Sequence, residues 1–207
     1  MRSRRRTVAR RATRRQSQKR ETHDRILSSA SSIARREGLR AASVPRVMSG
    51  AGLTVGGFYA HFDSKNSMDV EVIRIMLGSL PRWLSGLDDW SGLAWAQRAM
   101  GRYLSAAHRD NPDGCAYPAV LSEIASARPN VRQAFAEAFE QRVKAFEAQV
   151  PRVEGVSQRE RALATLALAM GGLLLARASA GHPVSDELLA ACKKWALPEL
   201  DSVQPRA

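Results

Sequence analysis

The chain lacks the features that would mark it as secreted or membrane-bound. Its 207 residues include two cysteines, Cys115 and Cys192, which are too few for the disulfide framework of a small secreted domain. The longest apolar stretch, residues 162–176, is interrupted by Thr165, whereas a membrane-spanning helix needs about 20 apolar residues. No apolar segment follows the N-terminal arginines, so a secretory signal is not expected. We therefore expect a cytoplasmic protein that does not use a membrane.

Motifs of catalysis and of metal binding are also missing from the sequence. The four histidines, His23, His61, His108 and His182, are not spaced as metal ligands. The chain has neither a G-x-S-x-G motif nor a glycine-rich phosphate loop, and only His108 with Cys115 would suggest a nucleophile and its base. We expect no enzymatic activity, no catalytic residue, no cofactor and no metal ion.

Acidic residues are absent from the first 20 positions, which contain ten Lys and Arg. This segment carries +10 of the net charge of +12, because residues 21–70 have six basic against five acidic residues and residues 71–207 have 16 against 15. Such a composition is typical of a disordered arm, and we expect one over residues 1–20 that follows the DNA backbone or lies in the minor groove. Two alternatives stay open: the segment precedes the natural start of the protein, or it is an organelle transit peptide.

Signals for β-strands are nearly missing, because no sustained alternation of apolar and polar residues occurs. Apolar residues recur every three or four positions instead, which predicts an all-α protein. Ser157 and Glu160 have the S-x-x-E spacing of a capping box at the start of one helix. Helices are expected from near Thr22 to Gly38, from Ser43, from Thr54, from Asn66 to Pro81, over 93–107, 118–127, 131–150 and 158–180, and from Ser185 to Pro198.

The segment 43–65, SVPRVMSGAGLTVGGFYAHFDSK, predicts two short helices joined by a turn at Gly52. Ser43 and Thr54 are suitable N-caps for these helices. Phe58 and Phe62 are four residues apart, which places both rings on one inward face of the second helix. This arrangement is typical of a helix-turn-helix, whose second helix can enter a major groove about 12 Å wide.

The same segment resembles the DNA-binding domain of the TetR/AcrR family of bacterial transcriptional regulators. The family signature has a helix-capping Ser or Thr, then A-G-[VL]-[ST], a few variable residues, and [FL]-Y-x-H-F-x-[SN]-K. In this chain the matching residues are Ser43, Ala51-Gly52-Leu53-Thr54, Phe58-Tyr59-Ala60-His61-Phe62 and Ser64-Lys65. The resemblance covers about residues 21–70 and implies that this range is a helix-turn-helix DNA-binding domain.

The resemblance also implies which residues contact DNA. Tyr59, His61 and Lys65 each offer a donor to phosphate oxygens. The helix N-termini that follow Ser43 and Thr54 favour a phosphate. Arg46 lies one turn into the first helix. Val55, Gly56 and Gly57 lie at the start of the second helix, where they can meet base edges. The expected DNA-binding residues are Ser43, Arg46, Thr54, Val55, Gly56, Gly57, Tyr59, His61 and Lys65.

Residues 71–207 resemble the effector-binding and dimerisation half of the same family through helix order and through the segment YLSAAHRDNPDGCAYPAVLSEIA. Residues 162–176 and the helix after Ser185 have apolar faces that a monomer would struggle to cover, so pairing with a second copy is expected. An effector pocket is expected among the preceding helices. Its candidate lining residues are Trp83, Trp90, Trp95, Met100, Tyr103, Cys115 and Tyr117.

These observations predict a homodimeric repressor that binds a palindromic double-stranded DNA operator and is released by a small-molecule effector. One alternative is a thiol-based regulator of the same fold that responds to oxidants or electrophiles, because His108 and Arg109 precede Cys115 and Gly114 would expose it. Another is an architectural DNA-binding protein that uses the basic arm alone, without sequence preference.

Overall fold

The computed structural model describes residues 2–78, 84–112 and 115–196, with side chains in the first helix from Arg14 onward. All regular elements in these ranges are helices, apart from one isolated bridge between Val153 and Val156, which confirms the all-α class. The helices are α1 (Arg2–Glu37), α2 (Val44–Gly50), the 3₁₀ helix η1 (Val55–Ala60), α3 (Lys65–Gly78), α4 (Gly92–Tyr103), α5 (Ala106–Asp110), α6 (Ala116–Ala125), α7 (Pro129–Glu147), α8 (Gln158–Ala178) and α9 (Val184–Ala196).

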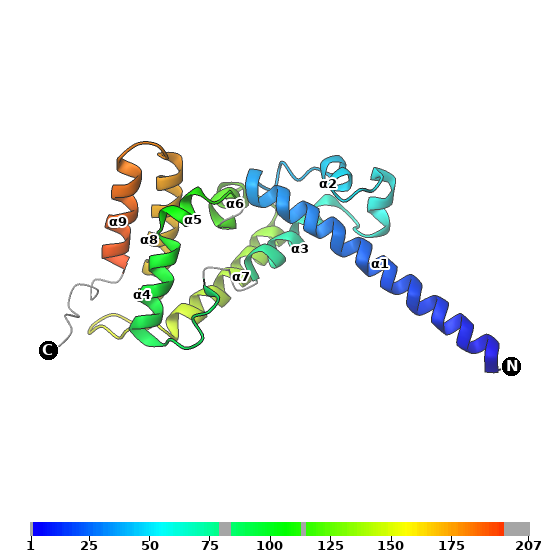
Figure 1. Cartoon of the computed structure of the whole chain (residues 1–207), viewed down its shortest axis with the longest axis horizontal. Helices are drawn as coiled ribbons and strands as arrows, with labels where there is room; N and C mark the ends of the chain where they lie inside the picture. Colours follow the sequence, from blue (N-terminus) through cyan, green and yellow to red (C-terminus); the bar gives the residue numbers. More distant parts are fainter. Residues whose placement is uncertain (1, 79–83, 113–114, 197–207) are drawn as a thin grey trace.

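A small N-terminal unit is built on the second half of α1, which contacts both α2 and α3 (Figure 1). Ile26 and Ala30 of α1 are completely buried, as are Met68 and Val72 of α3, so the apolar faces of these helices form one core. The positions are three to four residues apart, as expected for helices that each bury one face. This core holds α2 and η1 in place.

The N-terminal half of α1 differs from the disordered arm that we expected over residues 1–20. The helix is continuous from Arg2 to Glu37 and projects away from the rest of the molecule (Figure 1). Residues 2–37 contain no Gly or Pro and are rich in Arg, which favours helix. Thr22 is not an N-cap, because its hydroxyl donates to the Gln18 carbonyl at 2.9 Å, the back-bond of a mid-helix Thr.

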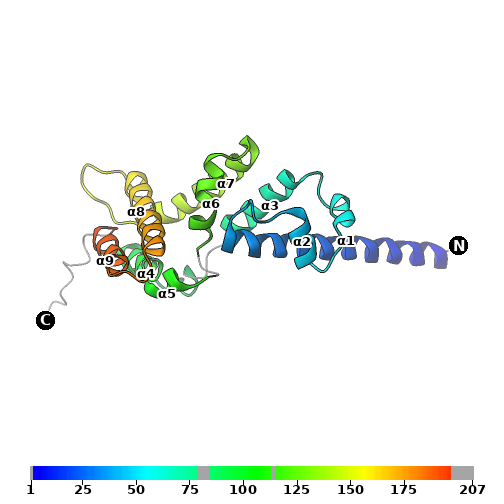
Figure 2. The same cartoon turned by 90° about the horizontal axis from the view of Figure 1, so that it is seen from above.

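The C-terminal half ends in the helix pair α8 and α9, which lie side by side at the opposite end of the molecule from the start of α1 (Figure 2). The predicted capping box is confirmed: the Glu160 backbone N–H donates to the Ser157 hydroxyl at 3.1 Å, and the Ser157 N–H donates to the Glu160 carboxylate at 2.9 Å. Helix α8 is long and apolar enough to cross a membrane, but 50% of its apolar window is buried inside the fold. It is a core helix.

The two halves are joined by α3, which begins beside the N-terminal core and then packs along α7. This helix crosses residue 70, where we expected one domain to end. The buried guanidinium of Arg142 in α7 donates to the Leu77 carbonyl at 2.9 Å, and Leu77 lies in the last turn of α3. A cation at a helix C-terminus stabilises the unpaired carbonyls there. Helix α6 also contacts α1, so the halves touch at two places.

Candidate DNA-binding surface

The turn between α2 and η1 depends on Gly52. Its φ is +68°, in the left-handed region that only glycine adopts without strain. The Leu53 N–H donates to the Met48 carbonyl at 2.8 Å, and the guanidinium of Arg25 in α1 donates to the Ala51 carbonyl at 2.6 Å. The turn is therefore closed by its own backbone and fastened to α1.

The inner face of η1 is aromatic and buried. Phe58 is completely buried and stacks on Phe62, with ring centroids 5.3 Å apart. The imidazole of His23 in α1 stacks on the ring of Phe62, with ring centroids 4.5 Å apart. Because these rings anchor η1 to α1, its remaining residues are directed away from the core. The four-residue spacing of the two phenylalanines predicted this anchoring correctly.

The outer face of η1 is open to solvent over its whole length. Thr54, Val55 and Gly56 at its start are exposed, and Tyr59 near its end is 69% exposed. The element is a 3₁₀ helix rather than the α-helix expected from Thr54. It contains two adjacent glycines, which are the poorest α-helix formers after proline. A short, slender helix with one exposed face has the shape that fits a major groove.

Gly56 has no role in the protein's own packing. Its φ is not positive, and a Cβ added there would meet no atom within 4 Å. Gly57 is similar, since an added Cβ would only touch the terminal methyl of Met48 at 3.7 Å. Neither the backbone nor the neighbours require glycine here. The backbone at Gly56 is therefore open to close approach from outside the chain.

His61 lies at the C-terminal end of η1, partly buried against α1. Its Nδ1 atom is buried without a hydrogen-bond partner among the described residues. Burial lowers the pKa of His61, and the nearby charges of His23 and Lys19 lower it further. His23 itself pairs with the carboxylate of Glu71 at 2.9 Å. The lowered pKa favours the neutral imidazole, which can donate through one ring nitrogen.

Ser43 and Arg46 flank the start of α2 at the surface. The Ser43 hydroxyl and the Thr54 hydroxyl both occupy N-cap positions, but neither makes the capping hydrogen bond, in contrast to the expected side-chain caps. Arg46 forms a bidentate ion pair with Glu37, at 3.0 and 2.8 Å, with half of its side chain exposed. An exposed pair of this kind contributes at most about 1 kcal/mol, so a phosphate can compete for Arg46.

Lys65, which we expected to contact phosphate, makes contacts within the protein in this structure. Its ammonium donates to both carboxylate oxygens of Asp69 at 2.8 Å and to the Leu39 carbonyl at 3.1 Å. Burial raises the pKa of Asp69, and the ion pair with Lys65 opposes that shift. In this structure Lys65 fastens the start of α3 to the loop after α1.

Two residues of α1 belong to this surface and were not singled out in the sequence. Lys19 is close enough to His61 for its charge to affect the imidazole, and Arg25 holds the turn at Ala51. Both lie far from the signature in sequence. The helical periodicity of α1 places Lys19 on the same side as His23, one turn later, whereas no local signal in the sequence indicated the contact of Arg25.

Only some of the candidate effector residues lie together. Tyr103, Cys115 and Tyr117 are brought together, and the Tyr103 hydroxyl lies 3.2 Å from the Cys115 Sγ. Trp90 is instead an exposed residue with the Arg98 guanidinium 3.5 Å above its ring.

The other candidates belong to the core or cannot be placed. Met100 is completely buried, and Trp95 packs edge-on against Phe146 at 5.0 Å. Trp83 lies outside the described residues. A cavity of about 510 Å³ lies elsewhere, between the N-terminal unit and α6 and α7, lined by Leu39, Arg40, Ser64, Lys65, Asn66, Asp69, Glu123, Ser126, Ala127, Arg128 and Val131.

Cys115 is not the exposed thiol that the thiol-sensing alternative requires. It is 6% exposed, and burial raises its pKa, an effect that the hydrogen bond with Tyr103 partly offsets. Burial also raises the pKa of Tyr103 well above its usual range. Because the thiolate is the reactive form, a buried thiol with a raised pKa is poorly reactive. The sequence could not show this burial, since Cys115 follows a turn-rich segment.

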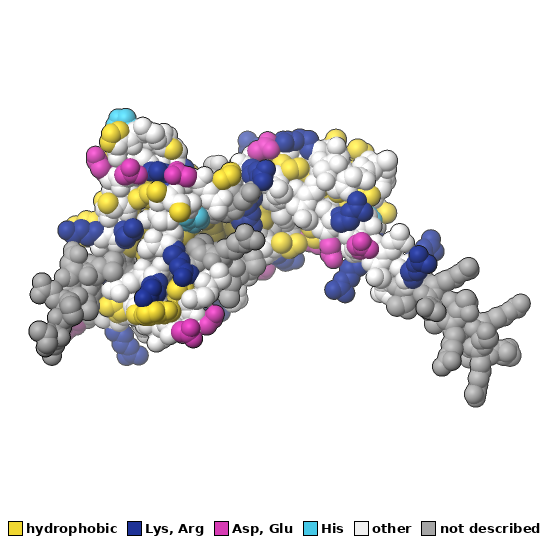
Figure 3. Space-filling model, viewed as in Figure 1, with side chains coloured by type: hydrophobic (Ala, Val, Ile, Leu, Met, Phe, Trp, Pro, Cys, Tyr) yellow, Lys and Arg dark blue, Asp and Glu magenta, His cyan; other side chains and the backbone are white. Residues whose placement is uncertain are grey.

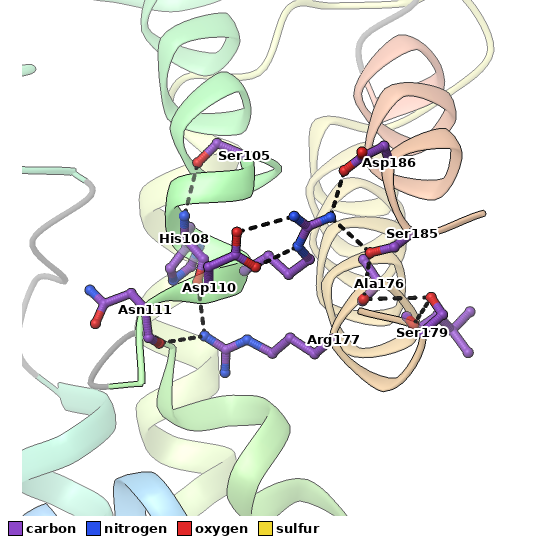
Figure 4. Close-up of polar contacts among 11 residues, drawn as sticks. Ser105, His108, Asp110, Asn111, Ala176, Arg177, Ser179, Ser185 and Asp186 are labelled. Carbon is purple, nitrogen blue, oxygen red and sulfur yellow. Dashed lines mark hydrogen bonds and ion pairs between the residues drawn. The ribbon is translucent and has the colours of Figure 1, made fainter. Parts of the chain in front are cut away.

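Arginines of two helices hold the segment around Cys115 onto the α8–α9 pair (Figure 4). The Arg177 guanidinium, in the last turn of α8, donates to the carbonyls of His108 at 2.9 Å, Asn111 at 3.3 Å and Cys115 at 3.4 Å. Arg109 of α5 forms an ion pair with Asp186 of α9. The chain segment beside the candidate effector residues is thus fastened to the last two helices.

The last two helices expose an apolar surface. On α8 the exposed residues Leu163, Leu174 and Leu175 follow one side of the helix, and Trp195 of α9 is 72% exposed. Small residues, including Gly171, lie between the leucines and are exposed as well. The other side of α8 is buried in the fold. Exposed apolar side chains gathered along one side of a helix make that side a candidate for contact with another protein.

The geometry is that of a helix-turn-helix DNA-binding protein: a pair of short helices, the second of which is exposed, is joined to a larger helical domain. Residues 26–72 match the family model described as bacterial regulatory proteins, tetR family. This segment is therefore a DNA-binding domain of the tetR family of bacterial regulators. A comparison with curated proteins gives no significant match.

Solved structures share the whole fold at low sequence identity. A transcriptional regulator from a Rhodococcus species is 21% identical, with a TM-score of 0.64 over 88% of this chain and 99% of that one. The reduced form of NemR from Escherichia coli is 16% identical, with a TM-score of 0.69 over 84% and 96%. A TetR-family regulator from Streptomyces coelicolor is 18% identical, with a TM-score of 0.61 over 87% and 96%.

Proposed function

We propose that this regulator is a homodimeric repressor that binds a palindromic operator and leaves it when a small molecule binds the C-terminal half. Residues 21–70 act as the DNA-binding domain and residues 71–207 as the effector-binding and dimerisation domain, with α3 shared between them. One observation carries the proposal. The face of η1 from Thr54 to Tyr59 is exposed, includes a glycine that the fold does not need, and is held rigidly by buried rings behind it.

Contacts with DNA divide into two kinds. Val55, Gly56 and Gly57 meet base edges, while the hydroxyls of Ser43, Thr54 and Tyr59 and the imidazole of His61 donate to phosphates. Arg46 exchanges Glu37 for a phosphate. Lys65 contributes by holding the start of α3, and contacts the backbone only if its pair with Asp69 opens.

Dimerisation uses the exposed apolar side of α8 and α9. Two copies joined there form a four-helix contact. The two α2–η1 units, which we call the reading heads, then lie on one side of the dimer. A two-fold axis matches a palindromic site, in which half-sites lie about 34–36 Å apart or at a multiple of that distance. Replacing Leu174 by Glu should therefore give a monomer in analytical ultracentrifugation, whereas the Ile75→Glu variant, changed at an exposed apolar residue of α3, should stay dimeric.

Effector binding is proposed beside Tyr103, Cys115 and Tyr117. This region lies at the start of α6, whose other end contacts α1, and the adjoining segment is fastened to α8 by Arg177. A ligand acts only through different affinities for the bound and released states, which typically differ by about 1–3 kcal/mol. Through these contacts, a ligand bound here can affect both the reading heads and the dimer contact.

The test is DNA binding by the full chain to the duplex that flanks its own gene, measured by electrophoretic mobility shift. We expect a specific, palindromic footprint and a loss of at least about tenfold, or about 1.4 kcal/mol, in the Tyr59→Ala variant. Trp90→Ala, which removes an exposed aromatic far from η1, is the matched control and should bind as the wild type. Equal binding by Tyr59→Ala, or an absence of sequence preference, would contradict the proposal. Release by candidate metabolites then tests the effector step.

A further inference from the structure

We infer that the basic first half of α1, residues 2–20, is a second DNA-binding surface: a helical rod that binds phosphates of the duplex beside the operator half-site. The inference rests on the proposed function, because it needs η1 to place the protein on DNA. It concerns a part of the chain outside the residues that match the family, which begin at residue 26.

The rod begins beside the reading head. The rings of His23 in α1 and of His61, at the end of η1, lie 6.2 Å apart, and Lys19 precedes His23 by one helical turn, so the basic half ends beside η1. From there α1 runs outward to Arg2 as one helix (Figure 1). At 1.5 Å per residue this length is about 25 Å, which corresponds to about seven base pairs at 3.4 Å each. The rod therefore reaches duplex that η1 does not touch.

Helix geometry decides where on the duplex the rod can lie. An α-helix with side chains is about 10–12 Å across, whereas the minor groove is about 6 Å wide. A helical segment therefore cannot enter the minor groove, which corrects one of the two placements expected from the sequence. The rod lies along the phosphate backbone or at the mouth of the major groove, where its position is set by the reading head.

Charge complementarity identifies phosphate as the partner. The segment has ten Lys and Arg and no acid, and Arg14, Arg15, Lys19 and Arg20 are all exposed. Figure 3 shows Lys and Arg side chains along the part of α1 whose side chains are described. Several of these cations lie four residues apart along the helix, a spacing at which like charges repel by about 0.2–0.5 kcal/mol per pair. Phosphates relieve this repulsion, and each phosphate contact releases counterions from DNA.

Duplex DNA fits the rod better than an anionic membrane does. Residues 2–20 contain only three apolar residues, Val8, Ala9 and Ala12, so the rod has no apolar side to insert between lipids. A helix that lies in a membrane interface needs such a side in addition to its charge. The position of Lys19 next to the reading face supplies the second argument, because DNA bound by η1 passes close to it.

The test neutralises one side of the rod in the full chain. Arg11, Arg14 and Arg15 have i, i+3, i+4 spacing and share one side of α1, and Gln keeps their helix propensity. The triple variant R11Q/R14Q/R15Q is compared with R132Q/K144Q/R152Q, which removes the same charge from exposed sites in the C-terminal half. Operator affinity is measured against salt concentration, on duplexes whose flanks extend by zero, four or eight base pairs beyond the half-sites.

We expect the slope of log affinity against log salt concentration to be shallower by about 2 or more in R11Q/R14Q/R15Q, the arm variant, than in the wild type. Each lost phosphate contact contributes about 0.9 to this slope. The wild type and the control variant should gain affinity with flanks of eight base pairs, and the arm variant should not. Equal slopes and equal flank dependence in all three proteins would overturn the inference while leaving operator binding intact. Failure of the wild type to bind any operator would instead overturn the proposed function. Arginine-dependent binding to vesicles containing anionic phospholipid, with an unchanged DNA slope, would assign the rod to membranes and also overturn it.

Discussion

The carboxylate of Glu123 in α6 accepts a hydrogen bond from the backbone N–H of Arg40 at 2.8 Å. The Arg40 guanidinium also reaches Ser126 at 3.3 Å. Gly38, two residues before Arg40, lies against the same carboxylate and against the Ala119 carbonyl. The end of the helix beside the candidate effector residues is thereby joined to the loop that closes α1, so Glu123 couples the two halves of the chain.

Replacing Glu123 by Ala should loosen the orientation of the reading heads. We expect the wild type to lose affinity steeply when one or two base pairs are inserted between the operator half-sites, and the variant to tolerate the insertion. Competition binding with a series of spaced operators measures this effect. Ser126→Ala, which removes only a weaker contact of the same loop, should keep the wild-type preference, and a Glu123→Ala protein with the same preference would show that the contact does not transmit orientation.

Gly38 should not tolerate a side chain. Its φ is +92°, and an added Cβ would overlap Glu123, so Gly38→Ala should lower the free energy of unfolding by about 1–3 kcal/mol. For a chain of this size that corresponds to a fall in Tm of about 2–4 °C per kcal/mol. Gly101→Ala is the matched control: it lies inside α4 with open space around it, so the same substitution should stabilise by up to about 1 kcal/mol. Thermal unfolding followed by circular dichroism distinguishes the two signs.

Gly56→Ala should separate folding from DNA binding. The added methyl meets nothing in the protein, so the unfolding temperature should stay the same or rise slightly. If the duplex approaches this backbone closely, operator affinity should fall by about tenfold, since a displaced base contact is worth about 1–3 kcal/mol. Unchanged affinity in a fluorescence anisotropy titration would show that η1 does not meet bases at this position.

The pKa of His61 should be lowered in the free protein and raised when DNA is bound. Burial and the charges of His23 and Lys19 lower its pKa below 6.5, so the unfolded chain takes up this proton more readily. Stability should therefore fall as the pH drops through and below about 6.5, and His61→Gln should remove that part of the fall. A phosphate beside the ring should raise its pKa, which an NMR titration with and without duplex would detect. Exposed His182 is the internal control, and an identical His61 titration in both states would exclude the phosphate contact.

Cys115 should react slowly with alkylating reagents. Its pKa is raised by burial, so little thiolate exists near neutral pH, and Tyr103→Phe should slow the reaction further by removing a hydrogen bond that favours the thiolate. Peptide mass spectrometry after timed iodoacetamide treatment measures the rate against a small thiol such as glutathione. Rapid labelling of Cys115 accompanied by release from the operator would restore the thiol-sensing alternative.

Local signals in the sequence predicted much of this structure. The Ser157–Glu160 spacing located the start of α8, and Gly52 located the turn of the reading unit, because each depends on residues within one helical turn. The phenylalanine spacing gave the buried side of η1 for the same reason. The all-α class followed from periodicity, which is a property of each segment by itself.

Features that depend on contacts distant in sequence were not predictable in the same way. The acceptors of Lys65 include Leu39, 26 residues earlier, so its internal role is visible only in three dimensions. Cys115 is buried and contacts Tyr103, twelve residues earlier, although its sequence neighbours are turn formers. The helical state of residues 2–20 was not predicted, because their high net charge favours disorder while the absence of Gly and Pro favours a helix.

Continuity of α1 makes its register as important as its charge. One rod carries the arginines at one end and the buried residues Ile26 and Ala30 at the other, with no break between them. Inserting a single residue near position 20 would turn the whole cationic end by about 100° around the axis, and inserting seven would bring it back to nearly its original direction about 10 Å farther out. In a disordered tail, the same insertions would change only the length of the tail.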